Sequence, residues 1–168
     1  MTTSDQDRGA RLSEAVRLRE AGDCEPARDI LLALSKAFPV DVEVAYQTAW
    51  VHDRLGLEAD AVPFYERALT GDGLAGDDRR GAYLGLGSTF RTLGRYDESV
   101  DVLRRGVADF PEDGGLRTFL AMALYNTAEH HEAMQLLLGV LAATSTDPGV
   151  QKYRRAIEHY AQDLDAVE

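Results

Sequence analysis

The chain has 168 residues, of which 45% are hydrophobic and 28% are charged, and its formal net charge is -11. This composition is typical of a folded globular protein and excludes a charge-rich disordered chain. The negative charge repels phosphate backbones and anionic lipid, so neither nucleic acid nor an acidic membrane surface is expected as a partner.

The N-terminal residues lack the apolar stretch of a signal peptide, and no later apolar run reaches the length of a membrane span. We therefore expect a cytoplasmic protein. The single cysteine, Cys24, agrees with a reducing compartment because it cannot form a disulfide within the chain. No histidine stands beside Cys24 in the sequence, so a nucleophilic role for its thiol is not expected.

Apolar residues recur at helical spacing through most of the chain, and glycine or proline interrupts the pattern at regular intervals. Residues 1–7 are predicted to be a flexible N-terminus, and residues 71–77 an irregular loop. The predicted helices span 8–21, 25–37, 41–55, 58–70, 78–93, 96–109, 114–127, 130–143 and 148–164.

A repeat of about 34 residues organises these helices. Small residues that allow a turn end four helices at spacings of 34, 38 and 34 residues, namely Gly22, Gly56, Gly94 and Ala128. Five positions later come small residues that let the paired helices cross closely, namely Ala27, Ala61, Ser99 and Ala133. Four positions further come larger apolar residues that fill the gap between the helices, namely Leu31, Tyr65, Leu103 and Leu137.

The clearest unit reads Tyr83-x-x-Leu86-Gly87-x-x-Phe90, followed by Gly94, Ser99, Leu103 and Pro111. This order of residues resembles the tetratricopeptide repeat family, and the resemblance covers residues 8 to 145. The arrangement is also similar to small bacterial members with a long loop between repeats and a C-terminal helix.

The resemblance implies an all-α fold, a right-handed α-α superhelix of about four helical hairpins closed by a C-terminal capping helix. A single domain is expected over 8–168. Its expected parts are repeats at 8–40, 41–77, 78–113 and 114–146 and a C-terminal helix at 147–165.

Several short motifs resemble those of ligand-binding or metal sites, but they lack the surrounding structure that such sites need. The G-x-G-x-x-G pattern of residues 71–76 follows a predicted helix rather than a strand, so a loop insertion is expected there instead of a dinucleotide site. In the run 129–132, Glu-His-His-Glu, adjacent side chains point in different directions, so no metal site is expected. His52 is predicted to be a hydrogen-bonded structural histidine. Since no nucleophile with a base and an orienting group emerges, we expect no enzyme activity and no cofactor.

If the hairpins stack as in the family, the inner helices line a concave groove that holds a partner. Arginines recur along it once per repeat in an otherwise acidic protein, so an acidic protein or peptide segment is the expected partner. The expected partner-binding residues are Arg19, Tyr46, Trp50, Arg54, Leu84, Arg91, Met122, Tyr125 and Asn126. The alternative is that Trp50 is buried between hairpins and the arginines pair with local acids such as Asp53 and Glu20.

These features favour a non-enzymatic protein-protein interaction module, an adaptor or scaffold that binds a peptide segment in the groove. The alternative is a homodimerising assembly protein that uses the groove or the C-terminal helix as the self-contact. Tyr153, Ile157 and Tyr160 share one side of that helix. We expect these three side chains to seal the fourth hairpin or to form a two-fold contact, and not to lie bare in water.

Overall fold

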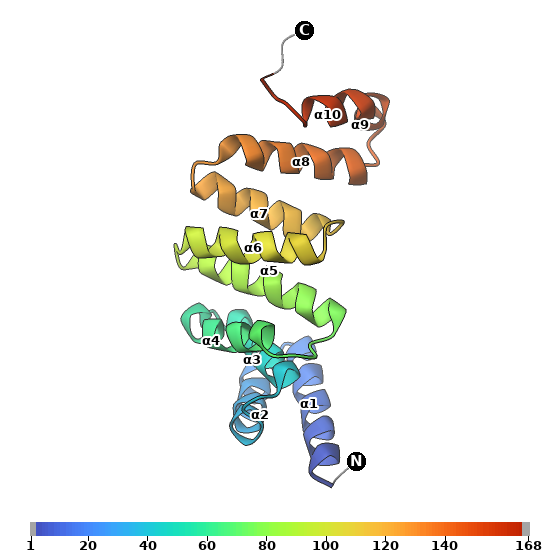
Figure 1. The fold of residues 1–168 in the computed structure, drawn as a ribbon. Coiled ribbons are helices and arrows are strands. Elements are labelled where there is room, and N and C mark those ends of the chain that lie inside the picture. Colours follow the sequence, from blue (N-terminus) through green and yellow to red (C-terminus); the bar gives the residue numbers. More distant parts are fainter. Residues whose placement is uncertain (1–2, 166–168) are drawn as a thin grey trace. The chain divides into compact units, whose positions relative to one another are not determined.

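The computed structural model describes residues 3–165, with side chains from Gln6 onward. Every regular element within these residues is an α-helix, which confirms the predicted all-α class (Figure 1). The helices are α1 Thr3–Ala21, α2 Cys24–Ala37, α3 Val42–Arg54, α4 Glu58–Thr70, α5 Gly76–Thr92, α6 Tyr96–Asp109, α7 Gly114–Asn126, α8 His130–Thr144, α9 Pro148–Lys152 and α10 Arg154–Tyr160.

Most helix bounds agree with the prediction within two residues, and the differences lie near the two ends of the chain. Helix α1 begins at Thr3, so residues 3–7, predicted to be flexible, are helical, while residues 1–2 of that prediction lie outside the described part. The predicted loop after α4 is present, although α5 takes up its last two residues. The predicted helix over 148–164 is wrong as one element, because it is divided into α9 and α10 at Tyr153.

The chain forms two compact units, Met1–Leu93 and Gly94–Glu168, and each is described by itself. In the first unit, α1 packs on α2, α2 on α3, α3 on α4 and α4 on α5, and α3 also contacts α1 and α5. In the second unit, α6 packs on α7 and α7 on α8, and α9 and α10 contact α8. Each unit is thus built from consecutive antiparallel helices with short connections.

The recurring small residues take the backbone conformation that their spacing predicts. Gly22, Gly56 and Gly94 have φ values of 94°, 70° and 73°, and Ala128 has φ 66°. This left-handed region suits glycine because a Cβ atom clashes with the backbone there, and Ala128 adopts it despite its side chain. The residues five positions later, Ala27, Ala61, Ser99 and Ala133, are all buried between their helices.

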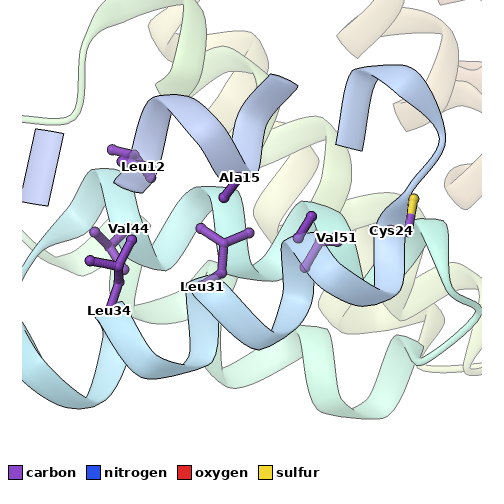
Figure 2. Close-up of a cluster of buried hydrophobic side chains, with 8 residues drawn as sticks. Leu12, Ala15, Cys24, Leu31, Leu34, Val44 and Val51 are labelled. Atoms are coloured by element: carbon purple, nitrogen blue, oxygen red, sulfur yellow. The ribbon is translucent and has the colours of Figure 1, made fainter. Parts of the chain in front are cut away.

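The core of the first unit joins its first three helices. Leu12 and Ala15 from α1 meet Leu31 and Leu34 from α2 and Val44 from α3 (Figure 2). The Cys24 thiol is free and buried beside this cluster. These contacts hold α1, α2 and α3 together and thereby position the side chains that α1 and α3 present on their other faces.

Two glycines of α5 allow it to approach tyrosines of the neighbouring helices. A Cβ atom on Gly81 would lie 2.2 Å from the Tyr46 hydroxyl oxygen, and one on Gly85 would lie 2.4 Å from Cζ of Tyr65. Both distances are too short for any side chain, so glycine is required by close packing at these positions.

The predicted role of His52 is confirmed. Its ring is buried, and Nδ1 lies 2.7 Å from the Thr48 carbonyl oxygen one turn earlier on α3. The ring also stacks on Phe64 with 5.2 Å between centroids. His52 is therefore a structural residue that joins α3 to α4.

Candidate functional site

Helix α3 presents a stripe of polar and aromatic side chains along one face. Glu43, Tyr46, Trp50 and Arg54 follow each other at intervals of three or four residues, so they lie one above another along the helix. The Asp41 carboxylate caps the helix by accepting hydrogen bonds from the amides of Glu43 and Val44. Trp50 and Arg54 are exposed on this stripe, whereas Tyr46 is buried.

The Arg19 side chain of α1 lies against this stripe. Its guanidinium carbon is 3.5 Å from the centroid of the Trp50 ring, and Nη1 donates a hydrogen bond of 2.5 Å to Oε1 of Gln47. The Tyr46 ring lies beside Trp50, with 5.6 Å between centroids. Arg19, Tyr46, Gln47 and Trp50 thus form one connected cluster, which we call the Arg19–Trp50 cluster.

The positive charge of Arg19 is buried and weakly compensated. Arg19 is 4% exposed, and the carboxylate paired with it belongs to Glu20, with Oε1 at 3.8 Å from Nη2. Burial lowers the pKa of the Arg19 guanidinium, and the positive charge of Arg54 acts in the same direction. The guanidinium nevertheless stays protonated in any physiological buffer. Since a buried charge is costly without a close counter-charge, the cluster is suited to receive a negative group.

Of the two acids named in the alternative interpretation, Glu20 pairs with Arg19, whereas Asp53 is bonded to other residues. Its carboxylate accepts hydrogen bonds from the Tyr65 hydroxyl at 2.7 Å and from the Thr89 hydroxyl at 2.8 Å. Burial raises the Asp53 pKa, while the two hydrogen bonds lower it and thus oppose part of this rise. The carboxylate therefore joins α3 to α4 and α5 and has a structural role.

Acidic groups gather at the other end of the same helices. Glu43 pairs with Arg8 at 2.8 Å, and Asp77 pairs with Arg80 at 3.1 Å. Burial and the nearby Glu43 raise the pKa of Asp78, and burial together with Asp78 raises the pKa of Tyr46 to about 12. The positive charge of Arg19 opposes part of both rises, so it lies within electrostatic reach of Asp78. The first unit thus carries acids near the start of α3 and α5 and a weakly compensated positive charge near the end of α1 and α3.

The remaining predicted contact residues divide between the two units. Leu84 and Arg91 are partly buried on α5, and Arg91 already has an interaction partner. The other three belong to α7 of the second unit, where Met122 and Asn126 are partly buried and Tyr125 is well exposed beside the His130 ring, 4.8 Å away. The structure therefore brings Arg19, Tyr46, Trp50 and Arg54 into one neighbourhood of the first unit.

Sequence reasoning missed two residues of this neighbourhood, Gln47 and Gly81. Gln47 lies one turn before Trp50 on the same face of α3, and this spacing could have identified it. No local signal distinguishes Gly81, because its role depends on the Tyr46 hydroxyl from another helix.

The histidine-rich run at the start of α8 does not gather into one set of ligands. Glu129 and Glu132 both pair with Arg104, at 3.0 Å and 2.7 Å. His131 instead lies near the exposed carboxylates of Asp163 and Asp165, and the three ligand atoms lie within 4.8 Å of one another. Exposed acidic groups are common at protein surfaces, so this arrangement alone does not define a metal site.

The C-terminal tyrosines lie in water in the isolated chain. Tyr153 is 58% and Tyr160 51% exposed, while Ile157 is partly buried. The expectation that these tyrosines seal the fourth hairpin is therefore wrong, and the two-fold contact stays a prediction. None of the helices described for this chain is both long enough and apolar enough to span a bilayer.

The fold and the repeat agree with comparisons to known proteins. A family model described as "Tetratrico peptide repeat" matches residues 42–164. None of the curated proteins compared with this sequence matches it.

Solved structures with the same fold share little sequence identity with this chain. YrrB, described as a TPR protein with an unusual peptide-binding site, matches with a TM-score of 0.72 and 16% identity over 92% of this chain and 78% of its own. MamA 41-end from Desulfovibrio magneticus RS-1 matches with a TM-score of 0.68 and 19% identity over 94% of each chain. The APC/C hetero-tetramer Cut9-Hcn1 contains a chain that matches with a TM-score of 0.73 and 17% identity over 90% of this chain and 30% of that one. Because the family model covers most of its length and these folds agree, the chain belongs to the tetratricopeptide repeat family.

Proposed function

We propose that this protein is a non-enzymatic adaptor or scaffold whose first unit binds an acidic segment of another protein at the Arg19–Trp50 cluster and Arg54. The tetratricopeptide repeat is generally a non-catalytic protein-interaction fold, which supports the general part of this proposal. A cytoplasmic location belongs to the proposal, and the free Cys24 thiol agrees with it.

The observation that carries the proposal is the buried guanidinium of Arg19, whose charge is only weakly compensated by the side chains that the structure describes. Its paired carboxylate oxygen is 3.8 Å away on Glu20, a side chain that is itself exposed. A carboxylate from a partner would supply the missing counter-charge in a site where little water screens the attraction.

Two exposed side chains beside Arg19 are available for direct contact. Trp50 is 37% exposed, so part of its indole ring can pack against an apolar side chain of the partner. Arg54 is exposed one turn further along α3 and can offer two parallel hydrogen bonds to a carboxylate. In this arrangement Arg19 holds the Trp50 ring and provides charge, while Trp50 and Arg54 contact the partner.

The peptide preference of the full chain can be tested with a displayed library of random peptides. Selected peptides should be enriched in Asp and Glu, and an Arg54→Glu variant should lose that enrichment. Trp50 is the only tryptophan of the chain, so its fluorescence reports binding at this site.

Affinities of a selected peptide then give the size of the effect. We expect Arg54→Ala to weaken peptide binding by about 1–3 kcal/mol. High salt should reduce the difference in affinity between the wild-type chain and this variant. Arg155→Ala removes an exposed arginine from the second unit and serves as the matched control. Peptides without acidic enrichment, or an affinity that is indifferent to Arg54→Ala and to salt, would contradict the proposal.

A second candidate function is self-association through the C-terminal segment. The exposure of Tyr153 and Tyr160 supports it, because large aromatic side chains are enriched at protein contacts. This function can coexist with peptide binding, since the two sets of residues lie in different units.

A further inference from the structure

The second helices of the second, third and fourth hairpins carry apolar residues at equivalent positions, six, nine and thirteen residues after the turn residue. In α4 these are Val62, Tyr65 and Leu69, which are 6%, 2% and 5% exposed. In α6 these are Val100 and Leu103, which are 6% and 0% exposed, and Val107, which is partly buried. In α8 the three are Met134, Leu137 and Leu141, which are 49%, 39% and 41% exposed. We call these last three residues the α8 stripe.

The difference comes from the helix that covers each position. Helix α4 is covered by α5 and α6 is covered by α7. Helix α8 is followed by the short α9 and α10, which contact α8 and lie beside it in Figure 1, yet leave the α8 stripe 39–49% exposed. Gln135 Nε2 donates to the Gln162 carbonyl at 2.9 Å, and residue 135 lies about 100° around the helix from Met134. In the earlier hairpins the next inner helix covers the equivalent residues. No described helix covers the α8 stripe in this way.

The chain itself contains a helix whose apolar side matches this open place. The α8 stripe has spacings of three and four residues, and Tyr153, Ile157 and Tyr160 beside α10 have spacings of four and three. Both patterns are those of helices that pack along a narrow apolar seam. Tyr153 and Tyr160 are both more than half exposed.

The net charges of the two segments are compatible with a contact between α10 of one copy and α8 of another. Residues 148–160 contain Lys152, Arg154 and Arg155 against Glu158, a net charge of +2 in a chain of net charge -11. Residues 114–144, which include α7 and α8, carry Arg117 against Glu129 and Glu132, a net charge of -1. The opposite signs of these two net charges reduce the repulsion that two copies of an acidic chain would otherwise experience.

We infer that the α8 stripe is covered by α10 of a second copy, and that the two copies exchange this contact reciprocally. Both halves of the contact belong to one unit, so a two-fold arrangement lets two copies cover both stripes and closes the assembly as a dimer. This inference rests on the second candidate function, self-association, and adds to it the surface that receives the tyrosines.

Sedimentation of the full chain over a range of concentrations tests the inference. The wild-type chain should dimerise, and Leu137→Glu should raise the dimer dissociation constant by about 30-fold or more, as expected for a residue at the centre of a contact. Tyr160→Glu should have a similar effect. Leu32→Glu is the matched control, because Leu32 on α2 and Leu137 are both 39% exposed. Circular dichroism should show the same helix content for all variants.

Cysteine cross-linking tests which surfaces meet. Met134→Cys and Tyr160→Cys should form a disulfide-linked dimer when the two variants are mixed, and neither should do so alone. The native Cys24 is buried, so the wild-type chain controls for background cross-linking.

The possible outcomes separate the inference from the function on which it rests. A chain that stays monomeric at all concentrations would overturn both. A dimer that tolerates Leu137→Glu and Tyr160→Glu, or that cross-links with Met134→Cys alone, would retain self-association and overturn the exchange of α10. Peptide binding at Trp50 should be unchanged in all of these variants.

Discussion

Helices α4 and α8 occupy the same place in their hairpins, yet they are buried to very different extents. Helix α4 buries Ala61, Val62, Tyr65, Ala68 and Leu69, whereas α8 buries Ala133 and Ala142. Their sequences are comparably apolar at the equivalent positions. The difference shows that, in a repeat protein, the neighbouring helix rather than the residue itself decides whether a side chain is buried.

The two units differ in their polar interactions as well. In the first unit the partly buried Asp53 and the buried Tyr65 and Thr89 join three helices, and the Arg19–Trp50 cluster lies beside them. In the second unit the ion pairs of Arg104 with Glu129 and Glu132 are exposed. The first unit therefore contains polar interactions that are largely withdrawn from water, while α8 of the second unit exposes apolar side chains.

The sharpest test of this comparison replaces two leucines from equivalent positions of the second unit. Leu103 is fully buried and Leu137 is 39% exposed. Leu103→Ala should cost about 2–5 kcal/mol in the free energy of unfolding because it leaves a cavity, and Leu137→Ala should cost less than about 1 kcal/mol in the monomer. Urea denaturation at low protein concentration measures both. Equal losses would mean that the α8 stripe is covered in the monomer.

The second largest effect concerns the approach of α5 to Tyr65. Gly85→Ala places a Cβ atom 2.4 Å from Cζ of the buried Tyr65 ring, whose hydroxyl donates to Asp53. We therefore expect a loss of about 2 kcal/mol in the free energy of unfolding. Gly9→Ala is the control, because no atom lies within 4 Å of a Cβ at that helical position. It should stabilise the protein by up to about 1 kcal/mol through helix propensity. A stabilising Gly85→Ala would show that α5 can move away from the tyrosine without loss.

A smaller effect on stability is expected at the turns between paired helices, where the last turn has alanine in place of the glycine of the other three. Ala128 adopts φ 66°, so Ala128→Gly should stabilise the second unit by about 0.5–1 kcal/mol. Gly56→Ala at φ 70° is the reciprocal change and should destabilise the first unit by about 1 kcal/mol. Thermal unfolding of the two variants checks the signs, which should be opposite.

The smallest effect is the pH dependence that comes from Asp53. Its pKa is raised in the folded protein, so the folded state binds the proton more tightly than the unfolded state. The corresponding stability is fully present below the unfolded pKa of about 3.9 and is lost as the pH rises through the folded pKa. Asp41 has the opposite sign, because the Arg8 contact helps to lower its pKa, and its contribution is lost as the pH falls.

The difference between the wild-type chain and Asp53→Asn isolates the contribution of Asp53. As the pH rises from about 4, the wild-type chain should lose stability relative to the variant, measured by urea denaturation at each pH. A difference that does not change with pH, or that changes in the opposite direction, would contradict this assignment.

Local patterns in the sequence were sufficient to predict most of the helices and their turns. The bounds 58–70 and 96–109 were predicted correctly, and so were the left-handed turns at Gly22, Gly56 and Gly94. Helical periodicity and the glycine conformation depend on neighbours a few residues away, which the sequence contains.

The exposure of individual side chains was decided only by the tertiary structure. Tyr46 and Trp50 share one face of α3, yet Tyr46 is covered because Gly81 lets α5 approach its hydroxyl, and Trp50 stays partly open beneath Arg19. Leu103 and Leu137 likewise hold equivalent positions, and only the helix packed against each distinguishes them. Burial depends on atoms brought in from distant parts of the chain, so the repeat pattern determined which residues could form a contact surface, and packing between helices decided which of them remained available.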